Sequence, residues 1–139
     1  MRMLYKDKSV YIFNVIEIMQ DRTIFDLQED CVFFIAVNNI NGSKITNYIY
    51  DILKTKCSYI MTYGKAAEEL HDIIDDIIVQ QSLANPDNQL GIVTDYRNDE
   101  ELSDSLDFFI NYTYFKEDKH SYVIIADEDH LASIYEKLV

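Results

Sequence analysis

The apolar residues of the chain fall into two alternating patterns: short uninterrupted runs, and longer stretches at helical spacing. The runs are rich in β-branched and aromatic residues, which is typical of strands. They predict strands at residues 10–18, 31–37, 58–62, 90–94 and 122–126. The longer stretches carry apolar residues every three or four positions. They predict helices from a cap at Ser43 to 55, at 66–83, from a cap at Asp99 to about 113, and at 129–138.

The order of these elements predicts the fold. After a leading strand, a strand and a helix alternate four times, which is typical of a mostly parallel sheet. Residues 31–37 (CVFFIAV) are a run of the kind found in a central strand covered on both faces. Residues 20–30 are interpreted as a connection with a short strand around 23–25. We therefore expect a single α/β domain over residues 1–139, a three-layer α/β/α arrangement with about five strands and helices on both faces.

The formal net charge of −13 is concentrated in one part of the chain. Residues 65–107 hold twelve acidic and two basic residues, whereas residues 1–64 hold seven of each. Such a surface repels phosphate, which argues against nucleic acid and against an anionic membrane as partners. It attracts a basic protein. An acidic surplus is also common in soluble proteins, so charge alone leaves a merely solubilising role open.

Neither a membrane span nor a secretion signal is predicted. The longest uncharged apolar run, 31–37, is too short to cross a bilayer. The first ten residues contain no apolar segment followed by a small-residue cleavage site. Cys31 and Cys57 match neither a C-x-x-C motif nor a metal-binding spacing. Two reduced, buried thiols and a cytoplasmic location are therefore expected.

Ligands of parallel α/β sheets usually bind at the carboxyl ends of the strands. The predicted strand ends are polar, aromatic and acidic, with Asn38, Tyr63, Gly64, Asp95 and Asp127 among their residues. The three glycines are isolated, and the chain contains no G-x-G-x-x-G, P-loop or G-x-S-x-G motif. We expect neither a nucleotide nor any other cofactor, and no catalytic serine of the hydrolase kind.

The stretch YGKAAEELHDIID, residues 63–75, places a histidine among carboxylates. His71 and Asp75 are four residues apart and share one flank of the predicted helix. Three interpretations remain open. The pair could bind a metal or perform acid-base chemistry with a third group such as Asp95. His71 could instead be structural, or the flank could meet a partner.

Like charges also face each other along this helix, at Glu68 and Asp72 and at Asp72 and Asp76. Each pair at this spacing disfavours the helix by a few tenths of a kcal/mol. Selection for stability alone would not choose them, whereas solubility or recognition would.

The same segment follows a longer pattern, C-x-Y-x-x-x-W-G-x-x-x-E-x-x-H-D-x-x-D. The matching residues are Cys57, Tyr59, Gly64, Glu68, His71, Asp72 and Asp75, with Tyr63 in place of the tryptophan. A T-x-[WY] strand end and an FF pair extend the match at Thr94, Tyr96, Phe108 and Phe109. Over roughly residues 31 to 126 the chain thus resembles a family of small bacterial α/β domains of unknown function. The resemblance implies an α/β fold and one site formed by residues 63–75 with Tyr96, and it implies no activity.

In general type, a small acidic domain without a catalytic motif resembles the immunity proteins of interbacterial competition systems. These proteins neutralise toxins, many of which are basic nucleases. We therefore expect a non-enzymatic binding protein, an immunity protein that occludes the active site of a basic bacterial toxin. The expected contact residues are two aromatic anchors and the acids of two helices: Tyr63, Tyr96, Glu68, Asp72, Asp75, Asp76, Asp99, Glu100, Asp104 and Asp107.

Two other hypotheses remain. One is a small-ligand-binding protein or metal-dependent enzyme that uses a strand-end rim formed by Asn38, Gly64, His71 and Asp95. The other is a homo-oligomeric scaffold that associates through residues 112–115. The sequence predicts no particular oligomeric state.

Overall fold

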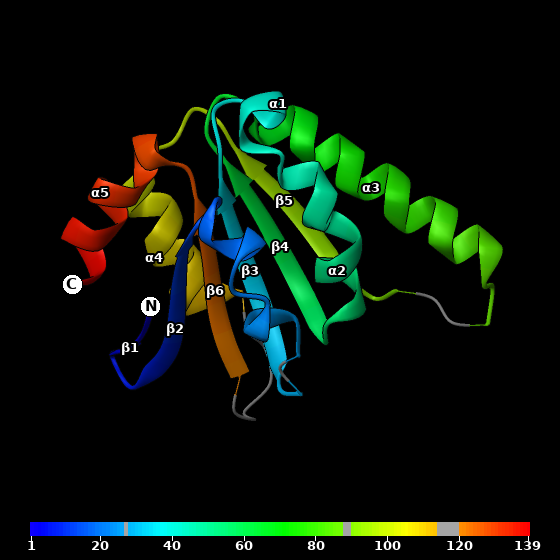
Figure 1. Cartoon of the computed structure of the whole chain (residues 1–139), viewed down its shortest axis with the longest axis horizontal. Helices are drawn as coiled ribbons and strands as arrows, with labels where there is room; N and C mark the ends of the chain where they lie inside the picture. Colours follow the sequence, from blue (N-terminus) through cyan, green and yellow to red (C-terminus); the bar gives the residue numbers. More distant parts are fainter. Residues whose placement is uncertain (27, 88–89, 114–119) are drawn as a thin grey trace.

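The computed structural model describes residues 1–26, 28–87, 90–113 and 120–139 (Figure 1). The strands are β1 (Arg2–Tyr5), β2 (Lys8–Asn14), β3 (Asp30–Ala36), β4 (Cys57–Tyr63), β5 (Val93–Arg97) and β6 (His120–Ala126). The α-helices are α1 (Ile40–Ser43), α2 (Ile49–Lys54), α3 (Ala67–Ala84), α4 (Leu102–Tyr112) and α5 (Glu128–Leu138). Short 3-10 helices are η1 (Glu17–Met19), η2 (Thr23–Asp26) and η3 (Ile45–Tyr48).

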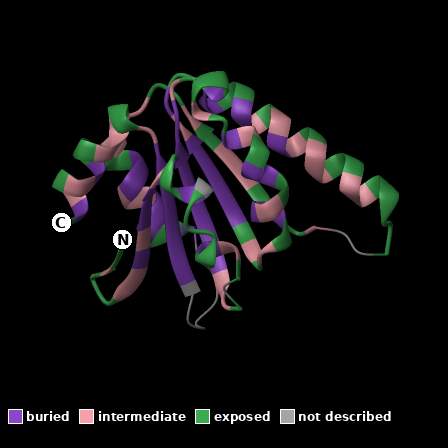
Figure 2. Cartoon of the chain, viewed as in Figure 1, coloured by how far each residue is buried: buried purple, intermediate pink, exposed green. Residues whose placement is uncertain are grey.

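The strands form one sheet in the order β1-β2-β6-β3-β4-β5. All neighbouring pairs are parallel except β1 and β2, which are antiparallel. The prediction of a mostly parallel α/β sheet is thus confirmed, with six strands instead of about five. β3 and β6 occupy the middle of the sheet, and their residues are almost all buried (Figure 2).

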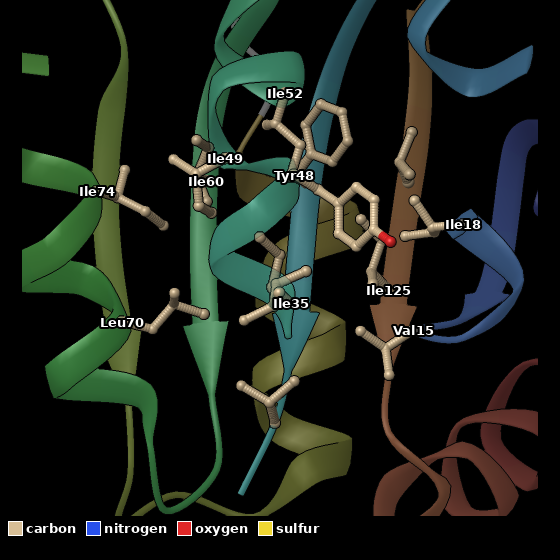
Figure 3. Close-up of a cluster of buried hydrophobic side chains, with 14 of the residues drawn as sticks. Val15, Ile18, Ile35, Tyr48, Ile49, Ile52, Ile60, Leu70, Ile74 and Ile125 are labelled. Atoms are coloured by element: carbon tan, nitrogen blue, oxygen red, sulfur yellow. The ribbon is translucent and has the colours of Figure 1, made fainter. Parts of the chain in front are cut away.

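One face of the sheet packs against α2 and α3. Ile35 of β3 belongs to a buried cluster with Ile49 and Ile52 of α2 and Leu70 and Ile74 of α3 (Figure 3). These isoleucines and leucines repeat at three- and four-residue intervals, so each helix turns one apolar stripe to the sheet. Burial of each such side chain stabilises the fold by about 1.5–3 kcal/mol.

The other face packs against α4 and α5. Successive side chains of a strand point to opposite faces, and Phe34, next to Ile35, belongs to a second buried cluster. That cluster includes Phe109 of α4 and Ile134 of α5. The alternation along β3 therefore supplies both cores, which explains why its sequence is apolar without interruption.

In the first thirty residues, one predicted strand ends earlier than expected and another does not form. The strand predicted at 10–18 is β2, which ends at Asn14, and residues 23–25 lie in the 3-10 helix η2 instead of a strand. β1 was not predicted. It joins β2 through Lys6 and Asp7, which have φ values of 48° and 66°. A two-residue hairpin loop with both φ values positive usually has the sequence Asn-Gly, so the sequence Lys-Asp does not predict this turn.

Three predicted boundaries also differ from the structure. The helix predicted from Ser43 to 55 is broken at Lys44, whose φ of 56° is left-handed, and Asn39 caps α1 in place of Ser43 by accepting a hydrogen bond from the Gly42 amide (2.9 Å). β5 begins at Val93, three residues later than predicted. α4 begins at Leu102 after Glu101, so Asp99 lies before the helix and does not cap it.

The connections leave the sheet in different directions at the carboxyl ends of the parallel strands. The chain passes from β3 and β4 to α1, α2 and α3 on one face, and from β5 and β6 to α4 and α5 on the other. Among β3, β4, β5 and β6, sheet neighbours therefore continue to opposite faces at two junctions, between β3 and β6 and between β4 and β5. Crevices at such junctions are the usual binding sites of this class of sheet.

Candidate functional site

Asp127 fills the junction between β3 and β6. Its backbone amide donates to the carbonyl of Ala36 (3.0 Å), and its Oδ2 accepts from the backbone amide of Asn38 (2.8 Å). Its Oδ1 lies 3.2 Å from the amide of His130 and 2.6 Å from His130 Nδ1. The carboxylate is thus held by a backbone donor that follows β3 and by one in the first turn of α5, and it in turn holds the His130 ring.

Gly64 closes the neighbouring turn after β4. Its φ is +103°, and a Cβ at this position would lie 2.6 Å from the carbonyl oxygen of Val37. It would also lie 3.0 Å from Asn38 Oδ1 and 3.0 Å from His130 Cε1. Asn38 accepts a hydrogen bond from the Lys65 amide (3.0 Å). The turn can therefore approach Asn38 and His130 only because residue 64 has no side chain.

An open hollow of about 470 Å³ lies at the junction between β4 and β5. We call it the His130 hollow, and its lining residues are Tyr63, Asn98, Asp99, Glu100, Glu101, Leu102, His130 and Ser133. The Tyr63 and His130 rings meet edge to face at 5.4 Å, and Tyr63 Oη donates to the carbonyl of Glu100 (2.8 Å). Burial raises the pKa of the Tyr63 hydroxyl, and the charges of Glu101 and Glu100 raise it further.

His71 lies away from this hollow, against the edge strand β5. Its Nε2 is 3.2 Å from Thr94 Oγ1 and 3.4 Å from Asp75 Oδ2, and Thr94 Oγ1 donates to Asp75 Oδ1 (2.6 Å). Its ring also packs against Tyr96 at 5.0 Å. The group ties α3 to β5, which is the geometry that the structural interpretation of His71 requires.

Asp95 lies on the opposite face of β5 from Thr94. Its Oδ2 accepts from Tyr59 Oη (2.9 Å) and forms an ion pair with Arg97 (2.9 Å). Tyr59 belongs to the cluster beneath α4 and α5, whereas His71 is a residue of α3, which covers the other face of the sheet. Burial first, then the hydrogen bond and the charge of Asp95, raise the pKa of Tyr59.

The predicted strand-end rim therefore does not assemble as one site. Asn38 and Gly64 lie at the carboxyl ends of the strands, and His71 and Asp95 lie on opposite faces of β5. Adjacent strand residues point to opposite faces, which separates Asp95 from Thr94 and its partners. Among the described residues, no group of three or more histidine, cysteine, aspartate or glutamate side chains could hold a metal ion.

The predicted contact residues divide into two groups. Those exposed to solvent are Glu68, Asp72, Asp76, Tyr96, Asp99 and Asp104. The others, which are less exposed and are held by contacts within the protein, are Tyr63, Asp75, Glu100 and Asp107, the last of which pairs with Lys137 (3.1 Å). Two of the exposed residues, Asp72 and Tyr96, also contact His71. Of the predicted oligomer contact at 112–115, Tyr112 is exposed and Thr113 is buried, and residues 114 and 115 lie outside the described ranges.

His130 was not among the predicted site residues. Its sequence signal was weak, an Asp-x-x-His spacing at the start of a helix, with Asp127 as the cap. The His130 ring contacts Tyr63, the last residue of β4, and lies beside Gly64, which follows it, and β4 is not a sheet neighbour of β6. Chain order alone does not bring these three positions together.

No curated protein and no solved structure is similar enough to the chain to count as a match. Residues 13–138 do match one protein family, and this range spans β3 to β6 together with both junctions at the carboxyl end of the sheet. The match agrees with the expectation of an uncharacterised family. The chain belongs to the family described as Domain of unknown function (DUF7684).

Proposed function

We propose that the protein is a non-enzymatic binding protein, an immunity protein that neutralises a basic bacterial toxin by covering its active site. The observation that carries this proposal is the position of the acidic residues. Residues 65–107 have a net charge of −10, from twelve acidic and two basic residues, and they form α3, β5 and most of α4.

Three of the four exposed acids of α3 form one stripe. Glu68, Asp72 and Asp76 follow each other at four-residue spacing, all three are exposed, and we call them the α3 acidic face. None of them has a lysine or arginine within ion-pair distance in the described part of the chain. Asp72 Oδ1 lies 3.2 Å from His71 Nδ1, and charges that no lysine or arginine pairs with remain available to a basic surface.

The start of α4 adds to the same end of the molecule. β4 and β5 are neighbours, and the Gly64 amide donates to the carbonyl of Arg97 (3.3 Å), so the segments that follow both strands start side by side. The segment after Arg97 brings the exposed acids Asp99 and Asp104. Arg97 itself is neutralised between Asp95 (2.9 Å) and Glu100 (2.8 Å).

The proposed mechanism is electrostatic steering followed by occlusion. A concentrated negative field raises the rate at which a basic partner finds the surface. Bulky contact then excludes the substrate of the toxin, with Tyr96, which is 38% exposed, as an aromatic anchor. Tyr63 supports the surface from below through its hydrogen bond to Glu100.

A cytoplasmic location is part of the proposal. Cys31 and Cys57 are both free thiols although their backbones are paired on adjacent strands. Free thiols are the usual state of cysteine in a reducing compartment. A helix that crosses a bilayer needs a length and an apolar content that none of the described helices has.

The test uses the purified products of the genes next to the one that encodes this protein. Each is passed over the immobilised wild-type protein and over the variant Glu68→Gln/Asp72→Asn/Asp76→Asn. A control variant, Asp7→Asn/Glu17→Gln/Asp26→Asn, makes the same change of net charge at exposed positions away from α3. We expect binding of a basic product, an association rate that falls about tenfold or more when ionic strength rises from about 0.05 M to about 0.5 M, and a loss of rate in the first variant only.

The binding partner should also lose its toxic activity when the wild-type protein is present. Equal loss of binding in the two variants would mean that binding depends on net charge and not on the α3 acidic face, which would then not be the contact surface. Failure of every basic neighbouring product to bind would overturn the proposed function.

A further inference from the structure

We propose that the His130 hollow is a binding site for a guanidinium group, the side chain of an arginine. This inference rests on the proposed function in one respect, because that function supplies the arginine from the surface of the basic partner.

The His130 ring is fixed with one nitrogen engaged. An ionised Asp127 can only accept, so the short contact of 2.6 Å requires that His130 Nδ1 carry the proton and donate it. In the neutral ring Nε2 is then an acceptor. Nε2 has no hydrogen-bond partner among the described residues. Because Asp127 does not line the hollow and His130 does, Nε2 is the polar atom that the ring can offer there.

The supports of this ring make its position rigid before any ligand arrives. Asp127 is held by the backbone amides of Asn38 and His130, and the ring lies against Tyr63 and the turn at Gly64. The side chain of His130 is only 12% exposed. A preorganised acceptor of this kind binds without the entropic cost of ordering a mobile side chain.

The lining determines the charge of the ligand. Three consecutive acids, Asp99, Glu100 and Glu101, line the hollow, and none of its described lining residues is a lysine or arginine. Glu100 pairs with Arg97 beside the hollow (2.8 Å), so Asp99 and Glu101 supply the charge that no lysine or arginine of the described residues pairs with. Phosphate, sulfate and carboxylate ligands are therefore disfavoured. A cation is favoured, and it must donate hydrogen bonds to both an imidazole nitrogen and a carboxylate.

A guanidinium fits these requirements better than an ammonium. Its planar fork presents five N–H donors, so it can reach His130 Nε2 and a neighbouring carboxylate at the same time. The Tyr63 ring provides an aromatic wall, which also favours a planar cation. The hollow volume of about 470 Å³ is ample for one arginine side chain.

The experiment compares two small probes that differ in charge. N-acetyl-arginine methylamide is titrated into the full-length protein while NMR follows the His130 ring and the Gly64 amide, and the citrulline analogue serves as the neutral probe. We expect saturable shifts at both reporters with the arginine probe, and binding of the citrulline probe at least about tenfold weaker, because a charge-assisted bond is replaced by a neutral one.

Two variants test the residues. His130→Asn removes Nε2. Glu101→Gln removes one charge from the lining and leaves His130 unchanged. Each substitution should lower the affinity for the arginine probe about threefold or more. Glu17→Gln, an exposed position outside the hollow, should have no effect. Equal affinity of the two probes, or unchanged affinity in Glu101→Gln, would overturn the inference even if His130→Asn failed to fold.

The same measurements separate this inference from the proposed function. Arginine-probe binding without any basic neighbouring product that binds would retain the hollow as a guanidinium site and overturn the immunity role. A basic product that binds equally well to wild type and Glu101→Gln, with no probe shifts, would support the immunity role and overturn the hollow.

Discussion

At the scale of single residues, Gly64 controls how close the end of β4 comes to its neighbours. A φ of +103° is costly for any residue with a side chain, and the Cβ would lie 2.6 Å from a backbone oxygen that cannot move away freely. We predict that Gly64→Ala lowers the free energy of unfolding by about 2–4 kcal/mol, measured by urea titration.

Gly91 provides the matched control for that prediction. No atom of the described residues lies within 4 Å of a Cβ built there, and its φ is not in the left-handed region. Gly91→Ala should therefore change the unfolding free energy by less than about 1 kcal/mol, with a stabilising sign if any. Equal effects of the two substitutions would show that the close approach at Gly64 is not what constrains the turn.

Residue patterns alone could not predict the His130 hollow. His71 attracted attention because four acids surround it in sequence, yet in the structure it joins α3 to β5 through Thr94. His130 has a quieter local sequence, and its importance arises from contacts with Tyr63 and with the turn at Gly64. Such contacts depend on strand order, which a single sequence does not encode in any local pattern.

At the scale of secondary-structure elements, the contact between α3 and β5 depends on a hydroxyl group. Thr94 Oγ1 donates to Asp75 (2.6 Å) and lies within hydrogen-bond distance of His71 Nε2 (3.2 Å). Thr94→Val keeps the shape of the side chain and removes its hydroxyl group. The partly buried side chains of Asp75 and His71 then lack the hydrogen-bond partner that Thr94 provides. We predict a loss of about 1–2 kcal/mol in the unfolding free energy, measured in urea.

The control for this prediction is Thr94→Ser, which retains the hydroxyl and removes the methyl group. It should keep most of the stability that Thr94→Val loses. A Thr94→Val protein as stable as the wild type would mean that the two elements are held by apolar packing alone.

The α3 acidic face carries a cost that can be measured. Asp72 has a like charge four residues away on both sides, at Glu68 and Asp76. Asp72→Asn removes both repulsions and keeps an oxygen that can accept from His71, which lies 3.2 Å from it. We predict that it raises the unfolding free energy by about 0.5 kcal/mol at low salt, and that the gain shrinks in about 0.5 M NaCl. Asp72→Glu, which retains the charge, should bring no such gain.

Element prediction succeeded where the pattern had one physical cause. β3 and α3 were found because a strand between two cores must be apolar throughout and a helix on one core must show a stripe. The helix predicted from Ser43 to 55 failed at Lys44, because its apolar spacing continues through a left-handed residue that interrupts the hydrogen bonding. β1 was missed because its strand is half exposed and its turn lacks glycine.

At the scale of the whole molecule, charge and burial are separated in space. The central strands β3 and β6 are almost wholly buried (Figure 2) and hold one acidic residue, Asp30, whereas most of the other acidic residues lie on helices and turns. The few ionisable groups that do lie in or beside the core are thiols and phenols, Cys31, Tyr59 and Tyr122 among them. These groups are neutral at ordinary pH, so their burial lowers the stability of the fold only at alkaline pH, where they ionise more readily in the unfolded chain.

Burial raises the pKa of Cys31 from 9.0 to about 11 and raises the pKa values of Tyr59 and Tyr122 above 10.0. A group that holds its proton more tightly when folded stabilises the fold fully below its unfolded pKa, and that stabilisation is lost as pH rises through the folded value. We therefore predict that the unfolding free energy, measured by urea titration, declines steadily between about pH 9 and about pH 11.

Cys31→Ala should make this decline shallower by up to about 1.4 kcal/mol per pH unit. Val32→Ala, which truncates the adjacent core residue without removing an ionisable group, should leave the slope as in the wild type. Parallel slopes in all three proteins would mean that Cys31 ionises as easily in the folded chain as in the unfolded one, and that its burial does not govern the alkaline limit.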